Sequence, residues 1–508
     1  MIGLWNLARA NPSHVAAIET DTGRSVTRGE LAARTHQVVN ALRERGMKEG
    51  SVIGIVLENE IPFLEVFFAG LQAGWYVVPL NYHFTSDEIG YILADSDAEA
   101  VVCSKRYADT VAVAAERAGI PNSMRLCVDG HEGFEDYDAV VGAASDAEPD
   151  GRTAGWMMTY TSGTTGSPKG IKRPLSGMDP DDVGEVWSLP MRIFGIEGDR
   201  HIHMLQSPVY HTAVLVYANA SAQFGHTIVM MRRWDAEDAL RQIERHRVTT
   251  SHMVPTHFHR MLQLPDDVKA EYDLSSMEYA VHGAAPCPIE TKRAMIEWWG
   301  PKIYEYYGAS EGGGTTVSPT EWLERPGTVG AAWPNADIRI FDADGNEVPR
   351  GETGEVWMLA GALDFEYHKN SERTSSSKRD GYFTVGDVGY MDEGGYLFLQ
   401  GRSSDIIITG GVNIHPSEIE GVLIQHPAVG DVAVFGIPDP EWGEQIKAVV
   451  ELAGEATTDE LLDHCKEHLA AYKAPRSIDI VDELPRDPNG KLYKRLLRDP
   501  YWETANQG

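Results

Sequence analysis

The sequence predicts an α/β protein with a large N-terminal domain and a small, mobile α+β domain after it. The large domain is expected to hold parallel-rich sheets with helices, followed by a smaller β part. Short apolar runs alternate with amphipathic segments in the N-terminal part, a pattern typical of parallel strands connected by helices. The chain has 508 residues, more than one hydrophobic core usually supports. Beyond Gly401 the pattern changes to strand, glycine pair, helix and strand.

The first elements follow from the spacing of apolar residues. Residues 28–46 place leucine and valine on one helical face, and Gly46 is expected to stop that helix. Residues 52–59 (VIGIVLEN) and 75–81 (WYVVPLN) are almost wholly apolar and are predicted to be buried strands. Residues 62–74 between them are predicted to form a helix.

The next elements continue the alternation. Ser86 is expected to cap the helix SDEIGYILADS, because serine accepts hydrogen bonds from the first helical turn. Residues 100–104 (AVVCS) and 125–129 (RLCVD) are predicted to be two further strands. Residues 172–200 contain several Pro, Gly and Asp residues and are predicted to form an irregular loop.

The charge balance and the cysteines limit the classes of function. The chain has 44 Lys and Arg against 76 Asp and Glu, a net charge of −32, which argues against nucleic acid or an anionic membrane as its main partner. Any phosphate site must therefore gather its few basic residues locally. The four cysteines form no CxxC pair, and the N-terminus has no basic region followed by a long apolar run. The widely spaced cysteines predict a reducing compartment, and there is neither a signal-peptide pattern nor an apolar stretch long enough to span a bilayer, so we expect a cytoplasmic protein.

The stretch Thr159–Ile171 (TYTSGTTGSPKGI) carries the clearest chemistry. The apolar residues 155–158 before it predict a buried strand that opens into a loop. Glycine lets backbone N–H groups approach a phosphate, hydroxyl groups donate hydrogen bonds, and lysine adds a positive charge. The loop differs from the Walker loop, and the alternative interpretation is a polar surface linker. The candidate phosphate-binding residues are Thr161, Ser162, Gly163, Thr164, Thr165, Gly166 and Lys169.

This loop resembles the phosphate-binding loop of the adenylate-forming enzymes, a superfamily of acyl-CoA synthetases, luciferases and nonribosomal adenylation domains. Ordered motifs continue the resemblance to about residue 491, so that it covers essentially the whole chain. It implies that a carboxylic acid reacts with MgATP to give an acyl-adenylate and pyrophosphate. CoA then takes the acyl group, and AMP is released. The implied cofactor is Mg2+, with ATP and CoA as co-substrates.

The segment Tyr304–Gly314 (YEYYGASEGGG) resembles the Tyr-Gly-x-Thr-Glu segment of these enzymes. The resemblance implies that Tyr307 stacks on adenine, Ser310 bonds the α-phosphate and Glu311 coordinates Mg2+. The residue types suit these roles, since they supply a π face, a hydroxyl group and a hard anionic oxygen. The tyrosines could instead be core residues, but Glu311 at this offset favours a site.

Two further segments complete the predicted nucleotide site. Gly283, Ala284 and Ala285 follow a predicted strand, where small residues would let a flat ring lie against the backbone. Asp387 matches the family's aspartate that accepts from both ribose hydroxyls, a role that suits a carboxylate. Arg402 matches the arginine that also reaches the ribose. Each of these two could be a surface charge, but their order and spacing together are specific.

Histidines are frequent between residues 201 and 260. No metal-binding spacing accompanies them, so we expect core or solvated histidines rather than a metal site. His211, in SPVYHTA before an apolar helix, resembles the aromatic or histidine gate near the carboxylate substrate and the entrance for pantetheine. The alternative interpretation of His211 is a polar residue that caps the helix.

The C-terminal domain is expected to cover residues 402–508, after an N-terminal domain of residues 1–401. The resemblance implies that it is a lid that rotates between the two half-reactions. Its hinge falls on Ser404, where Asp or Lys is usual, and a small residue can still absorb the change in dihedral angles. Gly410 and Gly411 resemble glycines that line the pantetheine channel, although a β-turn would also explain them.

The remaining motif residues also lie in the lid. Trp442, in a Glu-Trp-Gly-Glu context, resembles a residue that contacts CoA in the aryl-CoA ligases. Lys473 and Arg476 form a local basic cluster that suits CoA phosphates, although a solvated turn equally explains Arg476. Lys491, in a Gly-Lys turn, matches the catalytic lysine that bridges the substrate carboxylate and the α-phosphate.

Together these motifs predict an acid–thiol ligase that forms an acyl-adenylate and transfers the acyl group to CoA, most like the aryl- and fatty-acyl-CoA ligases. Three alternatives stay open. The enzyme could load a separate carrier protein, it could perform only one half-reaction, or the chain could be a silent nucleotide-binding scaffold. The sequence does not name the acid, and a homodimer is an expectation from the family alone.

Overall fold

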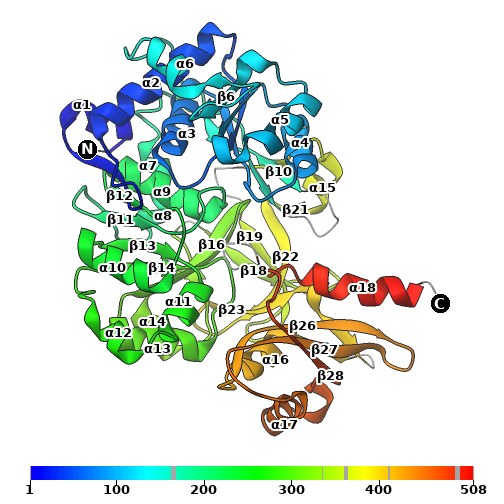
Figure 1. The fold of residues 1–508 in the computed structure, drawn as a ribbon. Coiled ribbons are helices and arrows are strands. Elements are labelled where there is room, and N and C mark those ends of the chain that lie inside the picture. The colour runs from blue at the N-terminus through cyan, green and yellow to red at the C-terminus, as the bar shows by residue number, and fades with distance from the viewer. Residues whose placement is uncertain are drawn as a thin grey trace.

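A parallel sheet forms the first subdomain of the molecule (Figure 1). Its strand order is β7-β6-β5-β3-β4-β8, and every neighbouring pair in it is parallel. The strands are β3 (Val52–Val56), β4 (Tyr76–Pro79), β5 (Ala100–Ser104), β6 (Arg125–Val128), β7 (Glu135–Asp136) and β8 (Trp156–Met157). The helices that accompany them are α2 (Arg28–Glu44), α3 (Ile61–Ala73), α4 (Ser86–Asp95), α5 (Ala108–Arg117) and α6 (Tyr137–Ala143). The computed structural model describes residues 2–161, 168–334, 336–359, 364–409, 412–486 and 492–506.

Burial explains why this part of the chain could be predicted. Strands β3 and β4 are buried along their whole length, as expected for parallel strands covered on both faces. Helix α3 between them is also buried on every side, which matches its apolar sequence. It ends at Gly74, whose φ of 73° is a left-handed conformation that favours glycine. The predicted alternation of strands and helices is therefore confirmed.

The predicted cap of α4 is wrong by one residue. Thr85, not Ser86, is the N-cap, and its side chain accepts a hydrogen bond from the backbone N–H of Glu88. The Glu88 carboxylate accepts in turn from the backbone N–H of Thr85 at 2.8 Å. This reciprocal capping box requires the acid three residues after the cap, and Glu88 meets that spacing only from Thr85.

A second, larger sheet combines a parallel part with an antiparallel part. The parallel strands are β1 (Val15–Glu19), β11 (Ile202–Leu205), β12 (Thr227–Met230), β13 (Thr250–Met253), β14 (Tyr279–His282) and β15 (Ile303–Ala309). At the edge of this part, β2 (Ser25–Thr27) pairs antiparallel to β1. The antiparallel strands are β16 (Gly312–Val317), β17 (Gly330–Ala332), β18 (Ile338–Phe341), β19 (Gly354–Leu359), β21 (Lys378–Arg379), β22 (Tyr382–Met391) and β23 (Tyr396–Arg402). The helices of this part are α9 (Thr212–Phe224), α10 (Ala236–His246), α11 (Pro255–Leu262), α12 (Asp266–Glu271), α13 (Ile289–Trp299), α14 (Pro319–Glu324) and α15 (Ser371–Ser376).

Residues 172–200 are more ordered than the sequence predicts. They contain two short helices, α7 (Gly184–Trp187) and α8 (Leu189–Arg192). Met191 and Ile196 from this segment are buried and pack in one cluster with Tyr217 of α9. The many Pro, Gly and Asp residues therefore mark turns between packed pieces. Most of the segment is irregular, as predicted, but two short helices that the sequence did not predict interrupt it.

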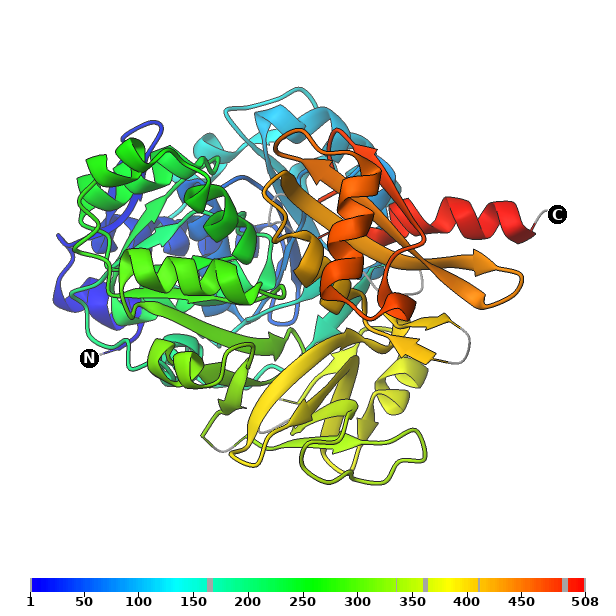
Figure 2. The ribbon, with the colours of Figure 1, turned by 90° about the horizontal axis from the view of Figure 1, so that it is seen from below.

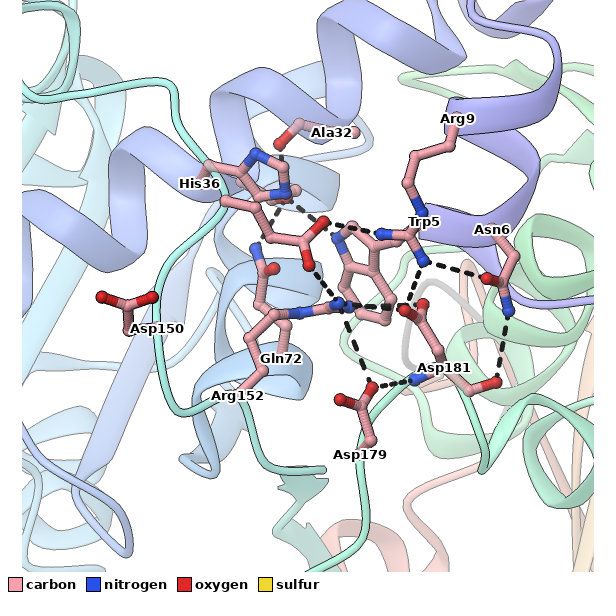
Figure 3. A network of polar contacts seen from close by, with 12 residues as sticks. Trp5, Asn6, Arg9, Ala32, His36, Gln72, Asp150, Arg152, Asp179 and Asp181 are labelled. Atoms are coloured by element: carbon pink, nitrogen blue, oxygen red, sulfur yellow. Dashed lines mark hydrogen bonds and ion pairs between the residues drawn. The ribbon is translucent and has the colours of Figure 1, made fainter.

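A polar network fastens the start of this segment to the N-terminal helix α1 (Leu4–Ala10), as Figure 3 shows. The guanidinium of Arg152 lies 3.0 Å from the Asp181 carboxylate and 5.0 Å from the centre of the Trp5 ring. The Arg152 side chain is only 5% exposed, and Glu148 approaches it at 2.9 Å. Chain segments far apart in sequence are thus joined by one buried charge.

The C-terminal part forms a separate small α+β domain with its own cluster of buried residues, seen in orange and red in Figure 2. Its sheet has the order β25-β24-β27-β26, and a further strand, β28, pairs parallel to β27. The strands are β24 (Ile407–Thr409), β25 (Val412–Ile414), β26 (Val429–Asp439), β27 (Gly443–Leu452) and β28 (Ser477–Val481). The helices are α16 (Pro416–Leu423), α17 (Thr458–His468) and α18 (Lys494–Asn506). The predicted large and small domains are confirmed, while their boundary at residue 402, where β23 ends, stays a prediction.

None of the helices in the described ranges has both the length and the apolar composition needed to cross a membrane.

Candidate active site

The predicted phosphate loop lies between two paired strands. Strand β9 (Thr159–Thr161) and strand β10 (Lys169–Lys172) are antiparallel, and Thr161 is the direct partner of Lys169. The two ends of the loop are therefore held side by side. The residues between them (Ser162, Gly163, Thr164, Thr165 and Gly166) lie outside the described residues, so their predicted roles stay predictions. Burial and the nearby Arg373 guanidinium lower the pKa of Lys169.

The residues predicted to bind the nucleoside come together from three strands. Tyr307 of β15 donates a hydrogen bond from its hydroxyl group to Oδ2 of Asp387 on β22, at 2.7 Å. Arg402 of β23 is the direct strand partner of Asp387, and its Nε lies 3.4 Å from Oδ1. Burial first, and then the Asp387 carboxylate, raise the pKa of Tyr307 far above its usual value. The Asp387 side chain is 14% exposed and that of Arg402 is 46% exposed, so this edge remains accessible to a ligand.

The small residues after β14 have a packing reason that the sequence did not indicate. A Cβ atom on Gly283 would lie 2.6 Å from the ring of Tyr306, so no larger residue fits there. Tyr306 is fixed by a 3.0 Å contact between its hydroxyl group and Nε2 of His252. Ala284 has a φ of 66°, a left-handed conformation that is uncommon outside glycine, and it is exposed. Ala285 is half-buried, and the contact of this turn with adenine stays a prediction.

The turn between β15 and β16 carries Ser310 and Glu311. Glu311 is buried, and its Oε1 accepts a hydrogen bond from the hydroxyl group of Tyr367 at 2.7 Å. Arg173 donates to the backbone carbonyl oxygens of Ser310 at 3.0 Å and Glu311 at 2.6 Å. The glycines that follow have φ values of 124°, 64° and 149°, so the turn depends on residues without a side chain.

Arg173 and Tyr367 are site residues that the sequence analysis missed. Arg173 follows the phosphate-loop strand directly, and an arginine so close to Lys169 in an acidic chain was an available signal. Tyr367 gave no signal, because its strand β20 (Glu366–Tyr367) is only two residues long and pairs with β10.

The residues present suit a magnesium ion that is held mainly by substrate. Within the described ranges, no group of three or more His, Cys, Asp or Glu side chains is arranged to hold a metal ion. Magnesium is usually bound by one or two carboxylates together with substrate phosphates and water. Tyr367 occupies one oxygen of Glu311, and the second oxygen can serve as the protein ligand. Glu311 therefore fits the predicted metal role, which stays a proposal.

His211 is the N-cap residue of α9, and the centre of its ring lies 4.4 Å from that of Tyr210, with the two ring planes tilted by 46°. Among the described residues its side chain makes no capping hydrogen bond with the helix. His211 therefore has the position of a capping residue, but its side chain does not cap the helix. Most other histidines of residues 201–260 are core residues, as predicted. Burial lowers the pKa of His252 and of His257 to about 3.

The described residues of the predicted CoA site gather on the lid. The guanidinium of Arg476 lies over the ring of Trp442, 5.5 Å from its centre, and Trp442 is 42% exposed. Lys473 is paired with the Glu418 carboxylate at 2.6 Å. Ser404 is exposed in a short 3-10 turn, where its hydroxyl group contacts Asp405 at 3.2 Å. The remaining lid residues of the prediction, Gly410, Gly411 and Lys491, lie outside the described residues.

Comparison with known proteins finds matches along the whole chain. The AMP-binding enzyme family matches residues 4–362, and the AMP-binding enzyme C-terminal domain matches residues 418–491. A feruloyl-CoA synthase from an Amycolatopsis species is 32% identical over 98% of this chain and 98% of its own length. The fatty acid–[acyl-carrier-protein] ligase ScoC from Streptomyces coeruleorubidus is 30% identical over 94% of this chain and 92% of its own. The crystal structure of ATP-bound MatB from Rhodopseudomonas palustris superimposes with a TM-score of 0.84 at 28% identity, covering 99% of this chain and 100% of MatB.

Proposed function

The chain belongs to the AMP-binding enzyme family, and on that premise we propose that it is an acyl-CoA ligase. It activates a carboxylic acid with ATP and transfers the acyl group to CoA, releasing AMP and pyrophosphate. One observation carries this proposal most directly. Tyr307, Asp387 and Arg402, which the motifs assign to one nucleoside, meet within hydrogen-bonding or ion-pair distance from three separate strands.

The first step forms the acyl-adenylate. A carboxylate oxygen of the acid attacks the α-phosphorus of ATP, and the bond from that phosphorus to the bridging oxygen breaks to release pyrophosphate. Asp387 accepts from the ribose hydroxyls, while Thr161 and Lys169 hold the two ends of the loop around the phosphates. Magnesium, where Glu311 would hold it, supplies positive charge to the phosphate oxygens. Lys491 bridges the acid and the α-phosphate, as the family motif implies.

The second step transfers the acyl group. The CoA thiolate attacks the carbonyl carbon of the acyl-adenylate, and the bond from that carbon to the phosphate oxygen breaks, which releases AMP. We assign Trp442 and Arg476 to the nucleotide of CoA, because an exposed ring beside a guanidinium suits an adenine and a phosphate. Rotation of the lid about Ser404 would bring Gly410 and Gly411 to the pantetheine arm and withdraw Lys491.

His211 supports the placement of the acid. It lies at the start of α9, at the edge of the sheet where strand β11 ends. In an α/β sheet, ligands bind beyond the carboxyl ends of the parallel strands, which is where His211 is found. We therefore assign His211 to the entrance shared by the acid and the thiol.

The test measures pyrophosphate release with MgATP across aromatic, medium-chain and polycyclic acids, with and without CoA. Acid-dependent release together with an acyl-CoA detected by mass spectrometry is the expected result. If every acid fails, synthetic acyl-adenylates with CoA are supplied instead. Failure of both reactions would refute the proposal and would favour a silent nucleotide-binding scaffold.

A carrier-protein ligase is the second candidate, and the similarity to ScoC favours it. In that case acyl-adenylate would form without CoA, and the acyl group would pass to a phosphopantetheine arm on a separate protein. Replacing CoA by a phosphopantetheinylated carrier protein in the same assay distinguishes the two acceptors. An enzyme limited to one half-reaction, which the serine at position 404 motivates, would give product in only one of the two assays above.

A further inference from the structure

Arg173 connects the phosphate-loop strand to two other segments of the site. It is buried, with 8% of its surface exposed, and it follows β10 directly. Its guanidinium donates to the carbonyl oxygens of Ser310 and Glu311, and at 3.4 Å to that of Asp364. Ser310 and Glu311 form the turn after β15, whereas Asp364 precedes β20. One side chain thus fixes the spacing of three chain segments.

The geometry of these contacts requires an arginine. The planar guanidinium presents several N–H groups in a fixed fork and can reach carbonyl oxygens in different directions. A lysine carries the same charge on a single nitrogen, and it cannot hold the same separation between the segments. A Cβ on Gly312 would lie 3.7 Å from the Arg173 guanidinium, and the φ of 124° at Gly312 keeps the turn against this group.

Tyr367 fixes the carboxylate of Glu311 from a strand that pairs with β10. Its strand β20 pairs with β10, and Tyr367 is the direct partner of Ile171, two residues before Arg173. Its hydroxyl group donates to Oε1 of Glu311 at 2.7 Å. The Arg373 guanidinium covers the same ring at 5.9 Å, so the tyrosine is held on both sides.

Strand β10 therefore connects Lys169 at the phosphate loop with the turn that carries Glu311. Lys169 stands at its beginning, beside the phosphate loop, and Arg173 follows its end, beside the Glu311 turn. The distance between a lysine that binds phosphates and a carboxylate that binds their metal ion must match the length of the bound triphosphate. Strand β10, with the Arg173 guanidinium at its end, sets that distance before the ligand binds.

We propose that Arg173 and Tyr367 are positioning residues that hold the Glu311 carboxylate at a fixed place relative to the phosphate loop, so that magnesium and ATP bind together. This inference rests on the proposed function, because it assumes that Glu311 meets a metal ion bound to ATP. Neither residue contacts the reacting atoms. Their role is exerted through Glu311, and the effect of losing them is a weaker coupling between metal and nucleotide.

The experiment measures ATP binding by titration calorimetry, with and without Mg2+, in the absence of any acid. The ratio of the two affinities in the full-length wild-type protein gives the coupling between metal and nucleotide. We expect Tyr367→Phe and Arg173→Lys to lower this ratio about 10-fold, because residues that hydrogen-bond to a metal ligand change metal affinity by about 10- to 100-fold. Arg173→Met should lower it further, because it also removes the charge.

Arg152→Met is the matched control, since it removes a buried arginine that is paired with Asp181 in the network of Figure 3 and is far from Glu311 in the sequence. It should lower the melting temperature and leave the coupling ratio unchanged. If Arg173→Met fails to fold, Tyr367→Phe and Arg173→Lys decide the question, because both keep the size of the side chain. An unchanged ratio in both of these variants would overturn the inference, and a full recovery by Arg173→Lys would show that charge rather than position matters.

The outcomes also separate this inference from the proposed function. If the variants lose the coupling, and the wild-type protein forms no thioester from any acid or from synthetic acyl-adenylates, the positioning role is supported and the ligase is refuted. Normal coupling in the variants of an active ligase would refute the positioning role alone. A wild type that binds no ATP would overturn both.

Discussion

Arg152 and Arg173 are both buried arginines, yet different chemical groups hold them. Arg152 faces the carboxylates of Asp181 and Glu148 and stacks on the indole of Trp5. Arg173 donates to backbone carbonyl oxygens at the edge of the nucleotide site. A carboxylate neutralises the guanidinium, whereas a carbonyl oxygen binds it without cancelling its charge. Both arrangements join chain segments, but Arg173 also shapes the turn that carries Glu311, where burial lowers the pKa of Arg173 and the carboxylates of Glu311 and Asp364 oppose that shift.

The difference teaches how an acidic chain builds an anion site. With a net charge of −32, most arginines of this protein find a carboxylate. Near Glu311, Arg173 and Lys378 gather beside one aromatic ring, and Lys378 is also ion-paired with the Asp364 carboxylate. Arg173 lies 6.0 Å from the ring centre of Phe365, and Lys378 lies over the same ring at 4.4 Å. The basic residues of this region are therefore held by an aromatic ring and by carbonyl oxygens in addition to a carboxylate.

In the candidate active site, where Arg173 lies, Glu311→Gln should have the largest effect on activity. The amide keeps the volume and still accepts from Tyr367, but it loses the anionic oxygen for the metal ion. We expect acid-dependent pyrophosphate release to fall by about 10²- to 10³-fold with no loss of thermal stability. Glu366→Gln changes an exposed glutamate on β20, next to Tyr367 in the sequence; it is the control and should retain wild-type rates. Equal rates for Glu311→Gln and wild type would remove Glu311 from the mechanism.

In the network around Arg152, Arg152→Met should have the largest effect on stability. It leaves the carboxylates of Asp181 and Glu148 beside a buried indole with fewer cationic partners. Breaking a buried pair costs about 3–5 kcal/mol, and the partial exposure of the two acids reduces this to about 3 kcal/mol here. Thermal unfolding measures the change, and the pyrophosphate-release rate well below the transition should match the wild type. A large loss of rate in the folded variant would show that the two networks are coupled.

The comparison also shows what the sequence could and could not predict. Buried parallel strands such as β3 were predictable, because covering both faces demands a continuous apolar run. Tyr307, Asp387 and Arg402 were predictable only because they stand in recognisable motifs. The structure brings their side chains together, while their roles stay predictions. The position of Arg173 close to Lys169 was a signal, but its contacts were not predictable, because they include backbone carbonyl oxygens, which every residue has. Contacts of this kind leave no pattern of residue types.

Asp387→Asn should give a smaller effect, limited to the nucleoside end of the site. Asparagine accepts through one oxygen only and so cannot serve both Tyr307 and the ribose. Removing one hydrogen bond to a charged group costs about 1.5–3 kcal/mol, which corresponds to a rise in the KM for ATP of about 10- to 100-fold. Steady-state kinetics measure it. Asp380→Asn, an exposed residue in a left-handed turn that asparagine tolerates, is the control. A normal KM in Asp387→Asn would refute the ribose assignment.

Trp442→Ala tests a cationic contact of a third kind, in which Arg476 lies over an exposed ring on the lid. An exposed cation–π contact contributes only about 0.5–1 kcal/mol, so the effect should be the smallest of the series. If the ring and the guanidinium bind CoA, the KM for CoA should rise about 3- to 5-fold, whereas pyrophosphate release without CoA should not change. Ile480→Ala, equally exposed at 42% on β28, controls for loss of lid surface. Since only the second half-reaction should respond, an equal loss in both half-reactions would mean that Trp442 supports the lid as a whole and that its assignment to CoA is wrong.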